Sequence, residues 1–184
     1  MNPAIFLDRD GVIIDNVSNY VRSWADVTFL PGSLSALAGL AGSFYKVVLV
    51  TNQSAVGRNV LSLEQVWNLN DQIVAEIRRV GGRVDGVYIC PHAPEQKCDC
   101  RKPRPGLILQ AARDLDIDLS RSFMIGDALS DLEAGRRAGV GKNVLVRTGR
   151  GAVQAQLPEA AAWMPFQVFE RMETAVEAIL SGHL

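Results

Sequence analysis

The chain has 184 residues and a nearly balanced charge, with 19 Lys and Arg against 20 Asp and Glu and a formal net charge of -1. This balance gives no electrostatic footprint for nucleic acid or an anionic membrane, and no segment approaches the roughly 18 consecutive apolar residues that span a bilayer. The length fits a single domain over residues 1–184. The first residues lack a basic stretch followed by a long apolar run, which predicts a cytoplasmic protein.

Apolar, strand-like segments alternate along the chain with amphipathic, helix-like segments. We expect strands at residues 4–7, 47–50, 87–89, 123–125 and 144–146, and helices at residues 31–40, 62–80, 105–115, 130–138 and 169–180. A further short strand is expected near Trp163. Such alternation is typical of a parallel sheet with crossover helices. It predicts an α/β fold in which the sheet is the middle layer of a Rossmann-like three-layer sandwich.

The first expected strand runs directly into two carboxylates, Asp8 and Asp10. Ligands of parallel sheets bind just beyond the carboxyl ends of the strands, and a spacing of two puts both side chains on the same side of an extended backbone. One carboxylate can then attack while the other moves a proton, provided that a divalent cation offsets their mutual repulsion. Taken alone, most such pairs are solvated loop acids.

Polar residues of complementary type follow other expected strands. Thr51 ends the second strand, Lys102 lies in the loop before the third helix, and Asp127 and Asp131 follow the fourth strand. Each has a simpler interpretation: a helix cap, a solvated surface charge, or acids favoured at a helix start. Together with the first strand's acids they supply the nucleophile, proton donor and positive charge that phosphoryl transfer needs, once magnesium is present.

All three cysteines of the chain lie within residues 90–100, together with one of its two histidines. An odd, clustered cysteine count favours a metal site over a disulfide framework, although a loop with three reduced thiols is the alternative. The four candidate ligands are Cys90, His92, Cys98 and Cys100. They complete a closed tetrahedral zinc site with no position for a reacting water, which predicts structural zinc. Arg101 and Lys102 follow directly, so zinc would fix the loop that carries Lys102.

Four short segments carry a resemblance to a known family. They are Phe6-Leu7-Asp8-Arg9-Asp10-Gly11, Thr51-Asn52-Gln53-Ser54, Lys102-Pro103, and Gly126-Asp127 with Asp131. In this order they resemble the four motifs of the haloacid dehalogenase (HAD) superfamily, over roughly residues 4 to 150.

The resemblance implies a role for each matching residue. Asp8 would be the nucleophile that forms an aspartyl-phosphate, and Asp10 would protonate the leaving oxygen and then activate water. Magnesium would be held by Asp8, the backbone carbonyl of Asp10 and Asp127, with Asp131 supporting the site from behind. The transferring phosphoryl group would be bound by Thr51 and Lys102.

Within the superfamily, the chain is similar to the zinc-containing branch that holds heptose-1,7-bisphosphate phosphatases and histidinol phosphatases. The expected elements fill the intervals between the motifs, so we expect no separate cap domain and a site covered only by loops. The candidate substrate-binding residues are Ser18, Asn19, Tyr20, Asn52, Arg58 and Arg101. Arginines near a phosphatase site suit a second phosphate, because a guanidinium binds it bidentately. Arg58 is equally well an ordinary solvated loop residue.

The expected partner is a small phosphorylated sugar, most of all a heptose 1,7-bisphosphate, bound by a monomer. Two departures keep histidinol phosphate as the alternative. The interval between His92 and Cys98 is short, as in histidinol phosphatases, and Ala128 stands where both subfamilies often carry a basic residue. A different class is a non-catalytic, zinc-stabilised binding module. Retention of both Asp8 and Asp10 argues against it, because a binding module has no need of this acidic pair.

Overall fold

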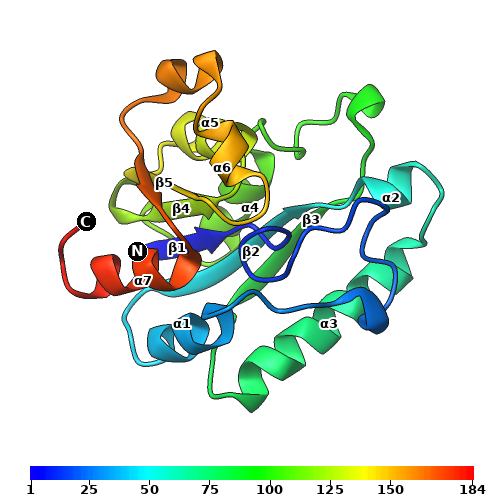
Figure 1. The fold of residues 1–184 in the computed structure, drawn as a ribbon, viewed down its shortest axis with the longest axis horizontal. Coiled ribbons are helices and arrows are strands. Elements are labelled where there is room, and N and C mark those ends of the chain that lie inside the picture. The colour runs from blue at the N-terminus through cyan, green and yellow to red at the C-terminus, as the bar shows by residue number, and fades with distance from the viewer.

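The computed structural model describes residues 1–184 and contains one six-stranded parallel sheet (Figure 1). The strands are β1 (Ala4–Leu7), β2 (Lys46–Asn52), β3 (Gly86–Cys90), β4 (Phe123–Gly126), β5 (Lys142–Val146) and β6 (Gln167–Phe169). Their order across the sheet is β3-β2-β1-β4-β5-β6. This arrangement confirms the expected α/β class and makes β1 a central strand between β2 and β4. The order reverses there, which is where open sheets of this type bind ligands.

Strand β1 is apolar throughout because both of its faces are covered. Ile5 and Leu7 belong to one hydrophobic cluster, whereas Ala4 and Phe6 belong to the other. All four residues are fully buried. The strand therefore fixes the direction in which the chain leaves the sheet at Asp8.

Helices pack on both faces of the sheet (Figure 1). α1 (Ser33–Leu40), α3 (Leu63–Arg79) and α7 (Met172–Leu180) contribute to the larger cluster, and α4 (Gly106–Asp114) and α5 (Leu129–Ala138) to the second. Helix α3 begins at a capping box, in which the Ser62 hydroxyl accepts from the backbone N of Gln65 and the Gln65 side chain accepts from the backbone N of Ser62. These helices correspond to those expected from the sequence.

The short connecting elements differ from the expected pattern. Trp163 ends a 3-10 helix, Pro158–Trp163, and the strand expected near it is β6, which follows Pro165. The strand begins after Pro165 because proline lacks the backbone N–H that a paired strand needs. Two further short helices, α2 (Ser54–Gly57) and α6 (Gly151–Gln154), were not expected, because four-residue helices are too short to show a periodic pattern.

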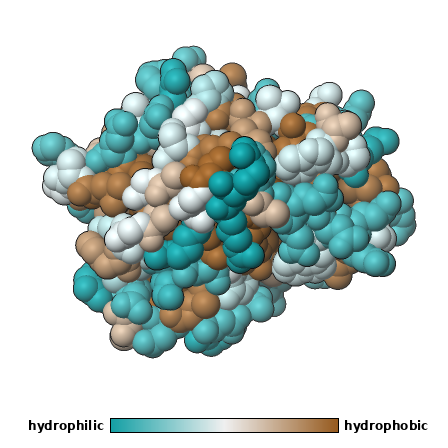
Figure 2. Space-filling model, turned by 90° about the horizontal axis from the view of Figure 1, so that it is seen from below, coloured by the Kyte–Doolittle hydropathy of each residue, from teal (hydrophilic) through white to brown (hydrophobic).

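Loops alone lie over the carboxyl end of β1, and the chain has no cap domain, as expected. The segment between β1 and α1 runs beside this end of the sheet and includes only one 3-10 turn, Trp24–Asp26. Figure 2 shows hydrophilic residues over much of the visible face, with apolar residues in separate patches. No helix in the structure is long and apolar enough to cross a membrane.

Candidate active site

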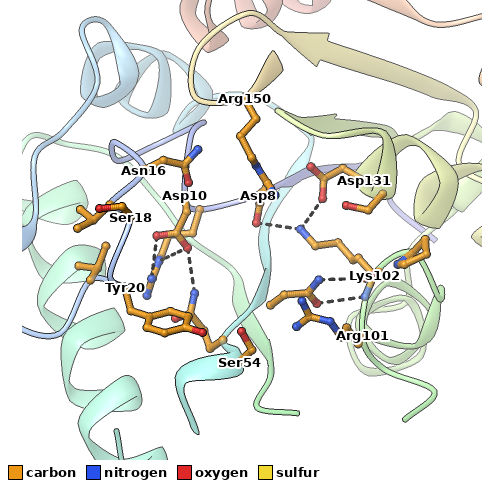
Figure 3. Close-up of a pocket in the computed structure, with 17 residues that line it drawn as sticks. Asp8, Asp10, Asn16, Ser18, Tyr20, Ser54, Arg101, Lys102, Asp131 and Arg150 are labelled. Carbon is orange, nitrogen blue, oxygen red and sulfur yellow. Dashed lines mark hydrogen bonds and ion pairs between the residues drawn. The ribbon is translucent and has the colours of Figure 1, made fainter. Parts of the chain in front are cut away.

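A cavity of about 740 Å³ opens at the carboxyl edge of the central strands (Figure 3). Only three of its 17 lining residues are hydrophobic. Six segments supply the lining: the residues after β1, the loop at 16–21, the end of β2 with the residues after it, the loop before α4, the start of α5, and Arg150. A strongly polar cavity of this kind fits a charged ligand.

Lys102 lies at the floor of the cavity between two carboxylates. Its Nζ is 2.8 Å from Asp8 Oδ1 and 2.7 Å from Asp131 Oδ1, and it also donates to the Val50 carbonyl at 2.8 Å. The lysine is only 3% exposed. A buried ammonium needs this full set of partners, because water is not available to solvate it.

Burial and the neighbouring charges together set the pKa values of Asp8 and Lys102. Burial raises the pKa of Asp8 to about 7, with Lys102 opposing the shift and the nearby carboxylates of Asp131 and Asp127 adding to it. For Lys102, burial by itself lowers the pKa, but the attraction of Asp131 and Asp8 outweighs it and raises the pKa above its ordinary value. Lys102 is therefore a permanent cation beside Asp8.

The backbone of Lys102 is fixed by the end of strand β2. The Asn52 side chain accepts from the backbone N of Lys102 and donates to its carbonyl, each at 3.1 Å. This double hydrogen bond joins segments 50 residues apart. Asn52 thus positions the backbone of Lys102, and because it also lines the cavity its predicted contact with substrate stays a prediction.

Asp8, Asp127 and Asp131 form a cluster of buried carboxylates whose nearest oxygens lie within 4.8 Å of one another. Asp127 is fully buried at the end of β4. Oxygen ligands in such a cluster suit Mg²⁺, which prefers carboxylates and water. Gly11, with a φ of +86°, lies against the Asp127 carboxylate so closely that a Cβ atom would collide with it. The donor set and its tight surroundings therefore fit a magnesium ion.

Asp10 has separate surroundings from Asp8. Arg9 Nη2 donates to Asp10 Oδ1 at 3.0 Å and Arg9 Nε to Oδ2 at 3.1 Å, while Gln53 Nε2 donates to Oδ2 at 2.9 Å. Thr51, buried beneath the cavity, has its hydroxyl 3.5 Å from the same oxygen. The carboxylate is held on the side away from Lys102 (Figure 3).

Arg9 is the largest fully buried side chain of the protein, at 1% exposure. Its third contact is with Asn70 on α3, whose Oδ1 accepts from Arg9 Nη1 at 3.3 Å and whose Nδ2 donates to the Val66 carbonyl. Sequence reasoning missed both residues. A polar Asn on the apolar face of a helix, four residues after Val66 and three before Ile73, was the available signal.

The four candidate zinc ligands converge on one point. The Cys90 sulfur lies 3.5 Å from that of Cys98 and 3.2 Å from that of Cys100, and His92 Nδ1 lies 3.3 Å from the Cys100 sulfur. All four ligand atoms lie within 4.8 Å of one another. The structure thus brings together a Cys3His cluster consistent with a metal site, and soft thiolate donors fit zinc rather than magnesium.

The expected substrate residues divide into two groups. The residues that line the cavity are Ser18, Tyr20, Asn52, Arg101 and Lys102, whereas Asn19, Thr51 and Arg58 do not line it. Arg58 instead pairs with Glu95 of the cysteine loop at 3.1 Å, so its role in substrate binding stays a prediction without support from the cavity. Arg150 lines the cavity and was not predicted. It lies beyond the matched motifs, so no local pattern connected it with the site.

Comparisons with known proteins agree with this geometry. A HAD-hydrolase-like family model matches residues 99–175. The D-glycero-beta-D-manno-heptose-1,7-bisphosphate 7-phosphatase of Photorhabdus laumondii is 43% identical over 167 residues, covering 86% of this chain and 87% of that protein. The protein of the same name from Helicobacter pylori is 40% identical over 173 residues, covering 93% and 95%.

A solved structure is similar over almost the whole chain. The D,D-heptose 1,7-bisphosphate phosphatase from B. bronchiseptica, crystallised with magnesium and phosphate, superimposes with a TM-score of 0.90 at 36% identity. The match covers 98% of this chain and 99% of that one.

The buried contact between Asn70 and Arg9 generates a stability prediction. Asn70→Ala removes the acceptor of Arg9 Nη1 and leaves a buried donor unpaired, which should lower the free energy of unfolding by about 1 to 3 kcal/mol. Urea denaturation measures the difference. Asn68→Ala on the exposed side of the same helix is the control and should change stability by less than about 0.5 kcal/mol. Equal stability of the two variants would contradict the prediction.

Proposed function

The chain belongs to the family of HAD-type heptose-1,7-bisphosphate 7-phosphatases, and we propose that it hydrolyses the C7 phosphate of a D-glycero-D-manno-heptose 1,7-bisphosphate. The observation that carries this proposal is the buried Asp8 beside Lys102 at the floor of a polar cavity, in a chain 40% or more identical to phosphatases of that name over most of its length.

In the proposed reaction, an Asp8 carboxylate oxygen attacks phosphorus, and the bond from phosphorus to the C7 oxygen breaks. Asp10 gives its proton to the departing oxygen. Asp10 then takes a proton from water, which attacks the aspartyl-phosphate and releases inorganic phosphate and free Asp8. Such proton transfers typically contribute about 10² to 10⁴-fold to the rate.

Positive charge around the transferring group comes from two sources. Lys102 is a cation under all ordinary conditions and lies 2.8 Å from Asp8. Asp8, the backbone carbonyl of Asp10 and Asp127 would hold magnesium, which supplies charge to the equatorial oxygens when bound. Thr51 would donate its hydroxyl to the same group. Asp131 holds Lys102 in place rather than touching substrate.

We propose that the Cys3His cluster binds structural zinc. Its four ligands fill a tetrahedral shell, so no position is left for a reacting water. Arg101 donates to the carbonyl of the ligand His92 at 3.2 Å, and Lys102 is the next residue. Zinc would therefore hold the segment that carries Arg101 and Lys102.

The second phosphate of the substrate would lie toward the mouth of the cavity, near Arg101 and the Ser18–Tyr20 loop. The cations lining the cavity favour a bisphosphate over histidinol phosphate, whose ammonium group would be repelled by them. All residues to which we assign a step of the reaction belong to a single chain, and we propose that a monomer is sufficient for activity.

Asp8→Asn tests the nucleophile. The amide cannot form the acyl-phosphate, so phosphate release from the heptose bisphosphate should fall to background while the protein remains folded by circular dichroism. Asp116→Asn, which changes an exposed acid far from the cavity, is the control and should keep wild-type turnover. Near-native, magnesium-dependent rates in Asp8→Asn would refute the mechanism.

Metal analysis tests the zinc site. Protein purified without chelator should contain one zinc per chain, retained when magnesium is removed. Cys98→Ala should lose zinc and most activity, because Arg101 and Lys102 are no longer held. Asp99→Ala alters the exposed residue between Cys98 and Cys100, and this variant should keep both its zinc and its activity. Zinc-free wild-type protein would rule out this site.

Paired arginine variants test the substrate. Arg101→Ala should lower kcat/KM for the heptose bisphosphate about ten- to a hundredfold, the value of a charge-assisted hydrogen bond, and should barely change it for p-nitrophenyl phosphate. In the wild type Arg58 pairs with Glu95 outside the cavity, so Arg58→Ala should have little effect on kcat/KM for either substrate. The assignment fails if Arg101→Ala impairs both substrates equally, or if the wild type prefers histidinol phosphate.

A further inference from the structure

The Asp127 carboxylate has a different set of partners on each of its oxygens. Oδ2 accepts from Asn16 Nδ2 at 2.8 Å and from the backbone N of Arg150 at 2.9 Å. The Arg150 guanidinium spans both oxygens, with Nη2 at 3.0 Å from Oδ1 and Nε at 3.3 Å from Oδ2. Nη2 of Arg150 is the only partner of Oδ1, so of the two oxygens Oδ1 has fewer competing hydrogen bonds, and we assign it to the metal ion.

A magnesium ion needs an oxygen at about 2.0 to 2.1 Å in near-octahedral geometry. A guanidinium that bonds to the same oxygen would place a second positive charge beside the ion and would compete with it for the lone pairs of that oxygen. We propose that the Arg150 side chain and the divalent cation alternate on Asp127, so that metal binding releases the Arg150 guanidinium into the cavity. This inference rests on the proposed function only in taking Asp127 as a metal ligand.

The structure separates the part of Arg150 that can move from the part that stays. Its backbone N is held by Asp127 Oδ2, and the neighbouring Thr148 hydroxyl donates to the Gly11 carbonyl at 2.6 Å. The side chain, by contrast, is 58% exposed and lines the cavity. Rotation of the Arg150 side chain away from Asp127 would therefore lose little packing, and it would break only the two hydrogen bonds from the guanidinium to the carboxylate.

Release of Arg150 changes what the cavity offers to a ligand. With the guanidinium on Asp127, its charge is neutralised by a carboxylate. Once displaced, the Arg150 guanidinium becomes an unpaired cation in the cavity. Arg150 and Arg101 lie on opposite sides of this cavity (Figure 3). Metal binding and phosphate binding would then reinforce each other, and by linkage the effect is reciprocal.

Calorimetric titration with Mg²⁺ alone tests the alternation without any turnover. Arg150→Gln should bind Mg²⁺ about three- to tenfold more tightly than the wild type, a range between an exposed ion pair and a charge-assisted hydrogen bond. It should also show a larger rise in melting temperature on Mg²⁺ addition. Arg147→Gln removes an equal charge three residues away, from a pair with Glu170 at 3.2 Å, and should match the wild type.

A second titration uses inorganic phosphate with and without Mg²⁺. The increase in phosphate affinity caused by Mg²⁺ should be larger in the wild type than in Arg150→Gln, because only the wild type gains a released guanidinium. An equal increase in both proteins would overturn this part of the proposal.

The outcomes separate this inference from the proposed function. Arg150→Gln that binds Mg²⁺ no more tightly than Arg147→Gln, or more weakly, would overturn the alternation on Asp127. The expected Mg²⁺ affinities in a protein that does not hydrolyse the heptose bisphosphate would overturn the proposed function and leave the alternation standing. Absence of Mg²⁺ binding in all three proteins would overturn both.

Discussion

The burial of one ammonium group between two carboxylates is the constraint on which the rest of the structure depends. Lys102 contacts Asp8 at the end of β1 and Asp131 in α5, so three distant segments must meet within hydrogen-bond distance. Removing one partner from such a group leaves an uncompensated buried charge, which costs several kcal/mol. The parallel sheet meets this demand because its strands end at one edge. The two hydrogen bonds from the Asn52 side chain hold the backbone of Lys102, and the bond from Arg101 to the His92 carbonyl joins the preceding residue to the cysteine loop.

Two acids only two residues apart have different surroundings, as the different roles proposed for them require. Asp8 faces the buried lysine and the other carboxylates, whereas Asp10 turns to Arg9, Gln53 and Thr51. Arg9 lies between them in the sequence and is buried on the Asp10 side, with Asn70 behind it. The larger hydrophobic cluster thus includes a polar connection from α3 to the candidate proton donor, which links helix packing to the site.

Sequence reasoning succeeded where the signal is local and failed where it depends on side-chain direction. The apolar run into Asp8 and the clustered cysteines each lie within a short stretch of sequence, and the fold class follows from the alternation of strand-like and helix-like segments. Arg150 could not be found in this way, because an exposed loop arginine has no distinctive neighbours. Asn70 does leave a signal, its position on the apolar face of α3, but that position does not indicate which group the side chain bonds to. For the same reason the sequence left two interpretations of Arg58 open, a substrate contact or a solvated loop residue, and it did not indicate the ion pair with Glu95. The strand β6 was misplaced by a few residues because it has only three.

The bonding of Lys102 has a further consequence for the rate of product release. An ammonium group has three donors, and here all three are used, by Asp8, Asp131 and the Val50 carbonyl. In the proposed reaction, a phosphoryl oxygen can gain a hydrogen bond from this lysine only by replacing an existing one. The net gain on binding phosphate is therefore small, although the charge still acts on the transition state. Such a lysine adds little to the affinity for the inorganic product, which favours its release between catalytic cycles.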